Sequence, residues 1–306
     1  MTERVLVGGT ASGKKTVAAA LARAFGLTVL SMDSMKVYRG MDIGTAKPSA
    51  ALRDEIDYEL LDLVGHDAPF STGRWLEAAI EAHAAASRPT LFAGGTPLYL
   101  RILLRGLFPG PPADPDVRAA LDRLWDEQGE AGLRAELARG DPEIEARLFP
   151  GDKRRLIRAL EVFRVSGRPL SAWQRDETLP PFGDQLSVCA LRHEPAEHLR
   201  RIEVRAAAMI DAGLVDEVAA LRARAAFAAE PGRAIGYTEA LARLDGSLDD
   251  AQMLERMVIR TRQMTRKQRQ FITSHAEVTW VDVPAHADDR AMVLVAEQVA
   301  EVLDLG

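Results

Sequence analysis

Residues 5–16 read VLVGGTASGKKT, and this stretch decides how the chain is expected to fold. The apolar run Val5 to Val7 predicts a buried strand, and a glycine-rich turn follows it. After Lys14 a helical pattern begins, and Gly26 supplies its stop. The apolar face of this helix is predicted to hold Val17, Leu21, Ala24 and Phe25. Strand, glycine-rich loop and helix in this order are typical of a parallel α/β fold.

The loop between strand and helix has the composition of a phosphate-binding P-loop. Consecutive backbone N–H groups and the helix N-terminus can converge there on an anionic phosphate, and Lys14 adds a positive charge. A purely structural turn is the alternative, since a glycine-rich turn alone is a weak signal. The predicted phosphate ligands are Gly8, Gly9, Thr10, Ala11, Ser12, Gly13, Lys14 and Lys15.

One position departs from the P-loop pattern. The residue after the loop lysine is ordinarily Ser or Thr, whose hydroxyl binds Mg²⁺, but here it is Lys15, which has only donors. Thr16 lies about 100° further round the helix and is a poor substitute. We therefore expect no metal held mainly by the protein. Mg²⁺ would be bound through the phosphate groups of the ligand and water, with the Lys15 ammonium supplying part of the missing charge.

The alternation of strand and helix continues to about residue 112. Strands are predicted at Thr28 to Leu30 and Thr90 to Ala93, each followed by Gly, Ser or Thr and then by helical periodicity. The stiff breaker PGPPADP at 109–115 then introduces purely helical signals. A strand pattern returns at Leu186 to Leu191. We therefore predict a P-loop α/β core formed by residues 1–112 and 186–306, with an all-helical insertion domain at 113–185.

Within the predicted insertion, three helices have clear start signals. Asp114 and Asp141 are each followed by Pro, which is an N-cap and first-turn pair. A third helix is expected to begin near Asp152 and to end at Gly167. Beyond the strand predicted at Leu186 to Leu191, the chain is expected to be mainly helical, with a long basic helix over about 250–274.

Composition excludes several classes of protein. With 306 residues and 47% hydrophobic residues the chain can bury a sizeable core, and no apolar run approaches the roughly 20 residues of a membrane span. Cys189 is the single cysteine, so neither an internal disulfide nor a cysteine-based zinc cluster can form. The histidines are scattered, and His193 and His198 are wrongly spaced to share one helical face. No leader precedes the first strand, so we expect a cytoplasmic protein, and a monomer.

The distribution of charge is uneven. The net charge is −6, which argues against a nucleic-acid partner, yet two runs are strongly basic. One run, 153–168, holds six Lys and Arg residues against the single acid Glu161, and the other, 256–269, holds six and no acid. Solvated helix faces are the alternative reading of either run.

Seven further blocks occur in an order that resembles the bacterial tRNA dimethylallyltransferase family. They are SMDSMKVYRGMDIGTAKP at 31–48, GGTPLYLRILLRGL at 94–107, GDKRRLIRALEVF at 151–163, RIEVR at 201–205, GLVDEV at 213–218, AIGY at 234–237 and TRQMTRKQ at 261–268. The resemblance spans nearly the whole chain.

The chain departs from the family pattern at a few positions. Gly9 stands where the family usually has Pro, and Tyr58-Glu59 where a paired His is usual. Met35-Lys36 follows the Asp-Ser pair, and Arg266-Lys267 reverses the usual order. Of all the departures, only Lys15 touches the expected chemistry.

The resemblance implies transfer of a dimethylallyl group from dimethylallyl diphosphate to the exocyclic N6 amine of the adenosine adjacent to the anticodon in tRNA, with release of diphosphate. Mg²⁺ would be bound mainly through that diphosphate. The implied partners are the tRNA anticodon stem-loop and dimethylallyl diphosphate, and no membrane is involved. A base in an RNA loop has to be extracted before its amine can enter a deep site.

The expected catalytic residues are Asp33, Thr96 and Lys14. Asp33 follows the second strand, where it can accept the proton of a weakly nucleophilic amine, and it is similar to the family's general base. The alternative reading is an Asp that caps the next turn. By resemblance Arg205 joins the P-loop in binding the leaving diphosphate, and Thr96 hydrogen-bonds the target nucleotide; a turn-forming Thr is the alternative.

The resemblance also implies an RNA-binding surface that includes both basic runs. We expect Arg154, Arg155 and Arg158 to point outward together from the third insertion helix. The expected tRNA contacts are Asp33, Ser34, Met35, Lys36, Thr96, Arg118, Arg154, Arg155, Leu156, Ile157, Arg158, Arg233, Ala234, Ile235, Gly236, Tyr237, Thr238, Arg266, Lys267, Gln268 and Arg269.

Two other functions use the same loop. A P-loop small-molecule kinase often carries an Asp at the end of the second strand to position a substrate hydroxyl, and its insertion would be a lid over ATP. A nucleotide-binding module without activity would explain Lys15. The missing Ser or Thr and the seven ordered blocks argue against the kinase, and the presence of Asp33, Thr96 and Arg205 argues against the inactive module.

Overall fold

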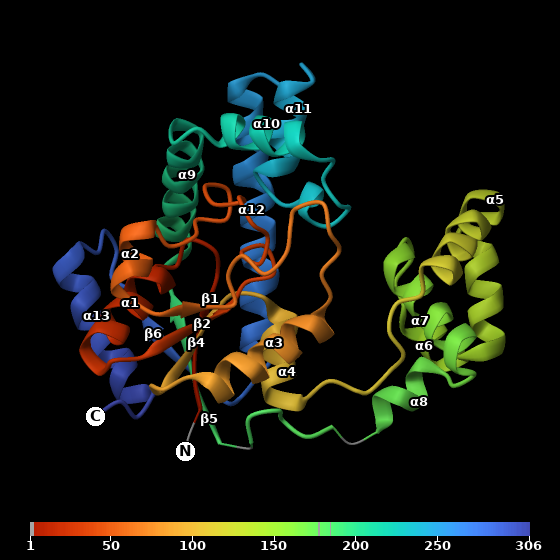
Figure 1. The fold of residues 1–306 in the computed structure, drawn as a ribbon, viewed down its shortest axis with the longest axis horizontal. Coiled ribbons are helices and arrows are strands. Elements are labelled where there is room, and N and C mark those ends of the chain that lie inside the picture. Colours follow the sequence, from red (N-terminus) through yellow and green to blue (C-terminus); the bar gives the residue numbers. More distant parts are fainter. Residues whose placement is uncertain (1–2, 177, 184) are drawn as a thin grey trace. The chain divides into compact units, whose positions relative to one another are not determined.

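In the computed structural model, which describes residues 3–176, 178–183 and 185–306, a six-stranded parallel sheet forms the centre of the α/β core (Figure 1). The strand order is β3-β2-β4-β1-β5-β6, and every neighbouring pair is parallel. The strands are β1 Glu3–Gly8, β2 Thr28–Met32, β3 Tyr58–Glu59, β4 Thr90–Gly94, β5 Leu186–Arg192 and β6 Val278–Asp282. The predicted fold class is confirmed.

Helices connect the strands and fill the remaining chain. In the α/β core they are α1 Lys14–Phe25, α2 Ala50–Glu55, α3 Thr72–Ala85, α4 Pro97–Arg105, α9 Pro195–Asp211, α10 Leu214–Arg224, η1 Pro231–Arg233, α11 Tyr237–Leu244, α12 Asp250–Thr273 and α13 Asp289–Val302. The others are α5 Pro115–Gly140, α6 Pro142–Arg147, α7 Lys153–Ser166 and α8 Leu170–Arg175. Among the residues described, no helix is both long and apolar enough to cross a membrane.

The sheet is covered on both faces. Adjacent residues of a strand point to opposite faces, so Val5 and Val7 pack against α3, α4 and α12 while Leu6 packs against α1 and α13. Figure 1 shows α1 and α13 side by side on that second face. Because both faces of the sheet are covered, the central strands β1, β2, β4 and β5 are mostly apolar, as is usual in all-parallel sheets.

The chain divides into two compact units. The α/β unit comprises the residues up to Leu104 and those from Pro181 onward, and the helical unit is Arg105–Pro180. The predicted boundaries, 113 and 185, lie eight and five residues later in the chain. Phe108 packs against the helical core, and Phe182 lies 4.9 Å, centroid to centroid, from Phe92 of β4. These two aromatic side chains explain why each boundary precedes the predicted one.

The helical unit begins its helices at the predicted caps. Asp114 accepts hydrogen bonds from the N–H groups of Asp116 and Val117, and Asp152 accepts one from Arg155. Asp141 caps α6 in the same way, and Gly167 ends α7 with φ 67°. Within α5, Gly129 has φ 65° and interrupts the helix, which the sequence pattern did not indicate.

Candidate active site

The P-loop lies at the carboxyl edge of the sheet, between β1 and α1. Gly13 has φ 87°, a conformation that side chains disfavour, and no side chain caps the helix that follows. The Lys14 ammonium donates to the carbonyls of Gly8, at 2.8 Å, and Gly9, at 2.7 Å, and to Ser12 Oγ at 3.2 Å. Burial, followed by the positive charges of Arg205 and Lys36, lowers the pKa of Lys14 to about 7. The loop thus surrounds its own lysine.

Side chains from the start of α9 hold the loop from outside. His198 Nε2 lies 2.7 Å from the carbonyl oxygen of Thr10, and His193 Nε2 lies 3.1 Å from that of Ser12. Arg201 Nε donates to the carbonyl between them, that of Ala11, at 3.0 Å. Three consecutive loop carbonyls are therefore fixed, which leaves the loop N–H groups directed elsewhere. Sequence spacing missed this pair of histidines because His193 precedes the helix and only His198 lies on it.

A glutamine of α12 ties the P-loop to the loop after β4. Gln268 Oε1 accepts the N–H of Thr10 at 3.0 Å, and its Nε2 donates to the carbonyl of Gly95 at 2.7 Å. The side chain is buried. We predicted Gln268 as a tRNA contact, but the structure commits its amide to two protein loops, so any RNA contact at this position would compete with them.

Asp33 and Thr96 follow two strands that are neighbours in the sheet. Because β2 and β4 pair in register, their carboxyl ends, Met32 and Gly94, lie opposite each other and both residues reach one edge. Asp33 Oδ1 accepts the N–H of Met35 at 2.9 Å, and Thr96 Oγ1 accepts the N–H of Ser34 at 3.1 Å. Both structural alternatives, a capped turn and a turn-forming Thr, are thus present. Among the residues that the structure describes, Oδ2 of Asp33 and the hydroxyl proton of Thr96 have no hydrogen-bond partner, so both are left for a ligand.

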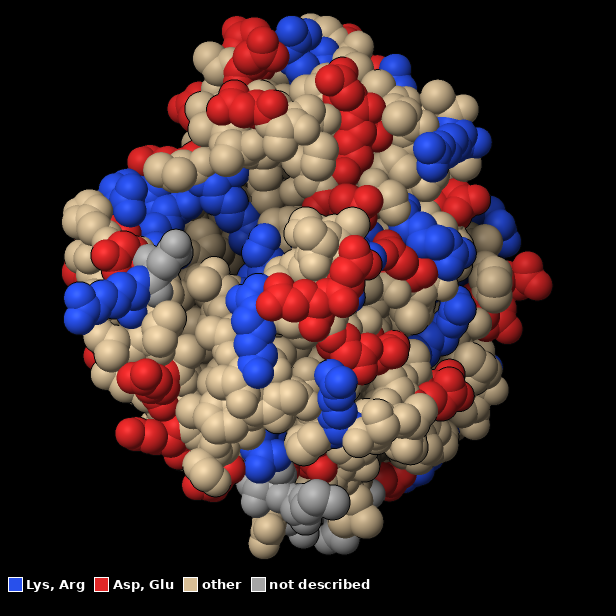
Figure 2. Space-filling view, turned by 60° about the vertical axis from the view of Figure 1, so that its left-hand side comes forward, with Lys and Arg blue, Asp and Glu red and all other residues tan. Residues whose placement is uncertain are grey.

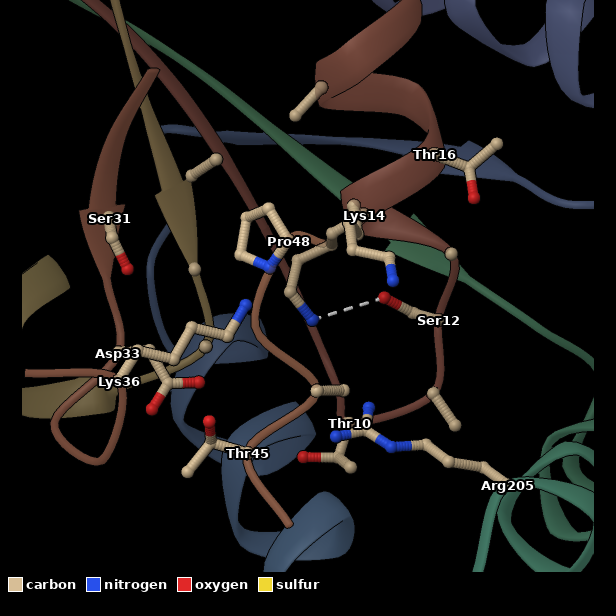
Figure 3. A pocket seen from close by; sticks show the side chains of 18 of the residues that line it. Thr10, Ser12, Lys14, Thr16, Ser31, Asp33, Lys36, Thr45, Pro48 and Arg205 are labelled. Carbon is tan, nitrogen blue, oxygen red and sulfur yellow. Dashed lines mark hydrogen bonds between the residues drawn. The ribbon is translucent and has the colours of Figure 1, made fainter. Parts of the chain in front are cut away.

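Two cavities of the α/β unit meet at these residues. The first, of about 460 Å³, is lined by the P-loop and by basic side chains (Figure 3). The second, of about 300 Å³, has an apolar part formed by side chains such as Met209, Met257 and Tyr237, beside polar residues such as Thr96 and Arg233. We call it the apolar cavity. The residues that line both are Thr10, Asp33, Thr45, Gly95, Arg205 and Gln268. A basic cavity and an apolar one thus share a single carboxylate, Asp33, at their junction.

Comparison with known proteins identifies the arrangement. The family model described as IPP transferase matches residues 36–275, and the one described as Isopentenyl transferase matches residues 1–62. The chain belongs to the IPP transferase family. A tRNA dimethylallyltransferase of Stenotrophomonas maltophilia is 40% identical over 291 residues, covering 90% of this chain and 91% of the relative. One from Azoarcus sp. is 40% identical over 306 residues, with 95% and 96% covered.

Solved structures of similar proteins share the fold of this IPP transferase. The full-length tRNA isopentenylpyrophosphate transferase of Bacillus halodurans aligns with a TM-score of 0.68 at 30% identity, covering 100% of this chain and 98% of that one. A eukaryotic dimethylallyltransferase acting on tRNA aligns with a TM-score of 0.75 at 23% identity, with 92% and 73% covered. At that identity the second likeness supports the fold alone.

The residues around the first cavity do not build a magnesium site. The position after the P-loop lysine is Lys15, and Figure 3 shows the hydroxyl of Thr16 on the far side of α1 from Asp33. Asp33 is the single carboxylate among the described residues that line the cavity. The part of the chain that the structure describes also contains no group of three or more His, Cys, Asp or Glu residues placed to hold a metal. Mg²⁺ prefers carboxylate oxygens, and beyond Asp33 the described lining offers only neutral oxygen groups such as the hydroxyls of Thr10, Ser12 and Thr45.

Several of the predicted RNA contacts are buried. Leu156 is fully buried in the core of the helical unit, and Tyr237 is fully buried with its hydroxyl donating to Glu217 at 2.6 Å. A side chain in the core of the helical unit cannot reach RNA on the surface, so the prediction for Leu156 needs correction: Leu156 belongs to the basic run 153–168, but on α7 it faces inward. Tyr237 lines the second cavity, so its contact with the nucleotide stays a prediction.

Two of the predicted RNA-binding arginines are engaged with an acid of their own unit. Arg118 makes paired hydrogen bonds to Glu161 at 2.7 and 3.1 Å, and Arg158 donates to the same carboxylate at 2.7 Å. The Glu161 side chain has no exposed surface. Arg158 therefore points outward only in part, with 32% of its side chain exposed against 69% for Arg155, because a buried carboxylate requires a cation beside it. Its contact with tRNA stays a prediction.

The other basic residues predicted to contact tRNA lie on the surface. Arg154, Arg155, Arg233, Arg266, Lys267 and Arg269 are exposed. Arg233 also lines the second cavity, together with Ala234 and Ile235. Figure 2 shows one face of the molecule on which Lys and Arg side chains gather around a hollow. The roles of these residues stay predictions.

Proposed function

We propose that this chain transfers a dimethylallyl group from dimethylallyl diphosphate to the N6 amine of the adenosine adjacent to the anticodon of a tRNA. The observation that carries the proposal is the junction of the two cavities at Asp33, Thr10 and Arg205. A diphosphate fits the basic cavity, a purine or a prenyl chain fits the apolar one, and the carboxylate lies where their reacting ends meet. Membership of the IPP transferase family supports this assignment.

The reaction exchanges one bond for another at the allylic carbon. The lone pair of the adenine N6 amine forms the new N–C bond, and the C–O bond to the diphosphate breaks with its electron pair on the leaving oxygen. The amine proton passes to the free Oδ2 of Asp33, whose other oxygen is held by the Met35 N–H. Removing that proton as the bond forms strengthens a nucleophile whose lone pair is otherwise delocalised into the ring.

The P-loop stabilises the charge that develops on the diphosphate. The loop residues Thr10 to Lys15 and Arg205 line the basic cavity, and fixed donors aimed at a leaving group lower the barrier. The N–H groups of Thr10 and Ser12 are bonded within the protein, so we expect the other loop N–H groups to contact the diphosphate. The Thr96 hydroxyl donates to the nucleotide. Mg²⁺, when bound, would neutralise part of the diphosphate charge, and we expect it to be held mainly through the diphosphate because Asp33 is the single carboxylate among the described residues of this cavity.

The tRNA binds through exposed basic side chains of both units, and the enzyme acts in the cytoplasm as a monomer. Because the acceptor is one base of the anticodon loop, the loop must release that base into the apolar cavity. Arg233 lies at this cavity and at the surface, which suits a residue that contacts the backbone beside the extracted nucleotide.

The decisive experiment incubates the protein with dimethylallyl diphosphate and tRNA that lacks the modification, and follows the mass of the adenosine beside the anticodon. We expect a gain of one dimethylallyl group in place of one hydrogen. Steady consumption of ATP with a small alcohol, and none of the prenyl donor, would identify a kinase instead.

The variant Asp33→Asn separates the role of Asp33 as proton acceptor from its role in holding the turn that follows β2. An amide oxygen still accepts the N–H of Met35 but the side chain no longer takes up a proton, so transfer should fall by roughly 10² to 10⁴ while both substrates bind. Asp33→Ala, which removes both interactions, should react at least as slowly. Undiminished turnover of the Asn variant removes Asp33 from the role of base.

A further inference from the structure

The basic cavity carries more positive charge than its own residues balance. Its lining includes Lys14, Lys15, Lys36, Arg200, Arg201 and Arg205, with Asp33 as the single acid among the described residues. Arg200 is paired with Glu197 at 2.7 Å, and Arg201 is held by the carbonyl of Ala11. The side chains of Lys15, Lys36 and Arg205 make no hydrogen bond or ion pair with the part of the chain that the structure describes.

The position of Lys15 is unfavourable unless an anion is present. It lies in the first turn of α1, which has two lysines, no acid and no side-chain cap. The N-terminus of a helix carries partial positive charge, so cations there are destabilising and anions stabilising. Lys15 is partly exposed to solvent and also lines the cavity, so its ammonium can reach an anion that the loop holds.

Lys36 reaches the cavity from the opposite side, on the loop that follows β2. In Figure 3 its side chain lies beside Asp33 and faces the P-loop across the cavity. Burial lowers the pKa of Lys36 to about 8 despite the carboxylate of Asp33, and the charges of Arg205, Lys15 and Lys47 add to the effect. Burial and Arg205 likewise lower the pKa of Lys15. The empty cavity therefore disfavours its own cations, and a polyanion relieves this repulsion.

We propose that Lys15 and Lys36 replace the divalent cation of an ordinary P-loop, so that this site binds a diphosphate without metal. The two ammonium groups supply positive charge from opposite walls, where a metal ion would supply it from between the phosphates. The proposal rests on the proposed function, since it names how that site binds its diphosphate. Mg²⁺ that accompanies the ligand is then dispensable for binding.

Calorimetric titration of the full chain with inorganic pyrophosphate, in excess EDTA and in excess Mg²⁺, tests this directly. The wild-type dissociation constants in the two media should agree within about threefold, and Lys15→Thr, which restores the usual P-loop residue, should bind at least about tenfold more weakly in EDTA. Mg²⁺ should recover most of that loss, because the new hydroxyl can ligate the ion. Lys36→Met should also weaken binding in EDTA.

The matched control is Arg88→Thr. Arg88 is exposed and precedes β4, at the amino edge of the sheet, so its loss changes the net charge as much but leaves the cavity unaltered. Its dissociation constants should equal those of the wild type. Wild-type binding that requires Mg²⁺ overturns the proposal, and so does a Lys15→Thr variant with equal losses in both media or with none.

Prenyl transfer measured on the same preparations in Mg²⁺ separates the two proposals. Transfer together with metal-dependent pyrophosphate binding contradicts the role of the lysines and leaves the proposed function intact. Absence of transfer in every medium contradicts the proposed function, while the calorimetry still reports whether Lys15 and Lys36 bind the anion without metal.

Discussion

Gly9 lies where two distant helices press against the P-loop. A Cβ at this position would lie 2.7 Å from Thr265 Cγ2 of α12 and 2.9 Å from His198 Cε1 of α9. Both neighbours are held, since Thr265 is buried and His198 is bonded to the carbonyl of Thr10. The family usually has Pro here, so this chain has combined a smaller loop residue with closely packed neighbours.

Gly9→Ala should therefore destabilise the protein by about 1–2 kcal/mol. Overpacking destabilises the folded state by more than the lower conformational entropy of the unfolded Ala chain stabilises it. Urea unfolding measures this. Adding Thr265→Ser removes only the crowding methyl group and should recover part of the loss, as a double-mutant cycle. Strict additivity of the two changes would show that the Cβ does not meet Thr265.

The lysine of the β2 loop should take up a proton when the anion binds. Lys36 faces Asp33, Arg205, Lys15, Lys47 and Lys14, and with its pKa lowered to about 8 it is mostly neutral at about pH 8.5. A bound diphosphate raises that pKa again, so the ammonium forms on binding. Calorimetry in buffers of different ionisation enthalpy measures the number of protons taken up when pyrophosphate binds. The wild type should take up about half to one proton more than Lys36→Met. Equal uptake would contradict a neutral Lys36 in the empty site.

At this scale the sequence predicted which residues lie together at the sheet edge better than it predicted their contacts. The P-loop and Asp33 follow from a motif whose backbone geometry fixes its neighbours. Arg118 and Arg158 were assigned to RNA because charge in a sequence reads as surface, whereas Glu161, the one acid in that run, is buried and holds both. Whether an arginine pairs with a buried acid or faces solvent depends on how the core packs, and the sequence pattern does not indicate that.

Helix α9, together with His193 just before it, supports the P-loop. His193, His198 and Arg201 hold three successive carbonyls, and burial lowers the pKa of both imidazoles, which keeps them neutral near physiological pH. Arg205, four residues after Arg201, lines the cavity from the same helix. Helix α9 therefore positions both the P-loop and Arg205, the residue expected to bind the diphosphate.

His198→Leu should weaken pyrophosphate binding by roughly tenfold, since a lost hydrogen bond of about 1 kcal/mol lets the loop move. His198→Gln should keep most of the affinity, because the amide nitrogen of Gln can donate from nearly the position of Nε2. The comparison by titration calorimetry isolates positioning from packing. Equal losses in the two variants would mean that ring packing, rather than the bond to Thr10, supports the loop.

Strands were predicted where apolar residues run without interruption. β1, β2, β4 and β5 lie in the middle of the sheet and are buried on both faces, and each was found within two residues of its observed ends. The edge strands β3 and β6 were missed. β3 has only two residues, and in β6 the exposed Thr279 and Asp282 break the apolar run, although VTWV has the β-branched and aromatic composition of a strand.

The whole molecule is acidic, so its affinity for tRNA has to come from where its charges lie. Salt dependence reports this, because each phosphate contact releases counterions and contributes about 0.7 to 0.9 to the slope of log K against log salt. Two arginines of α7 differ in a way that the experiment can use. Arg155 has a side chain 69% exposed and pairs with Asp152, whereas Arg158 is bonded to the fully buried Glu161.

Arg155→Ala should reduce the slope for tRNA binding by roughly one contact and change the free energy of unfolding by less than about 1 kcal/mol, since exposed ion pairs contribute little.

Arg158→Ala should instead destabilise the helical unit by about 1–3 kcal/mol, because Glu161 loses one of its two cations while Arg118 remains. Burial raises the pKa of Glu161, but its hydrogen bonds outweigh this and hold the pKa below the usual range. The stability that this carboxylate contributes is therefore present above the ordinary Glu range and is lost as the pH falls through its lowered pKa, and Arg158→Ala should reduce that acid-sensitive part. Filter binding over a salt series measures the slope, and thermal melts at neutral and acidic pH measure the stability. If Arg158→Ala changed only the slope and Arg155→Ala changed only the melting temperature, the roles given to these two arginines would be contradicted.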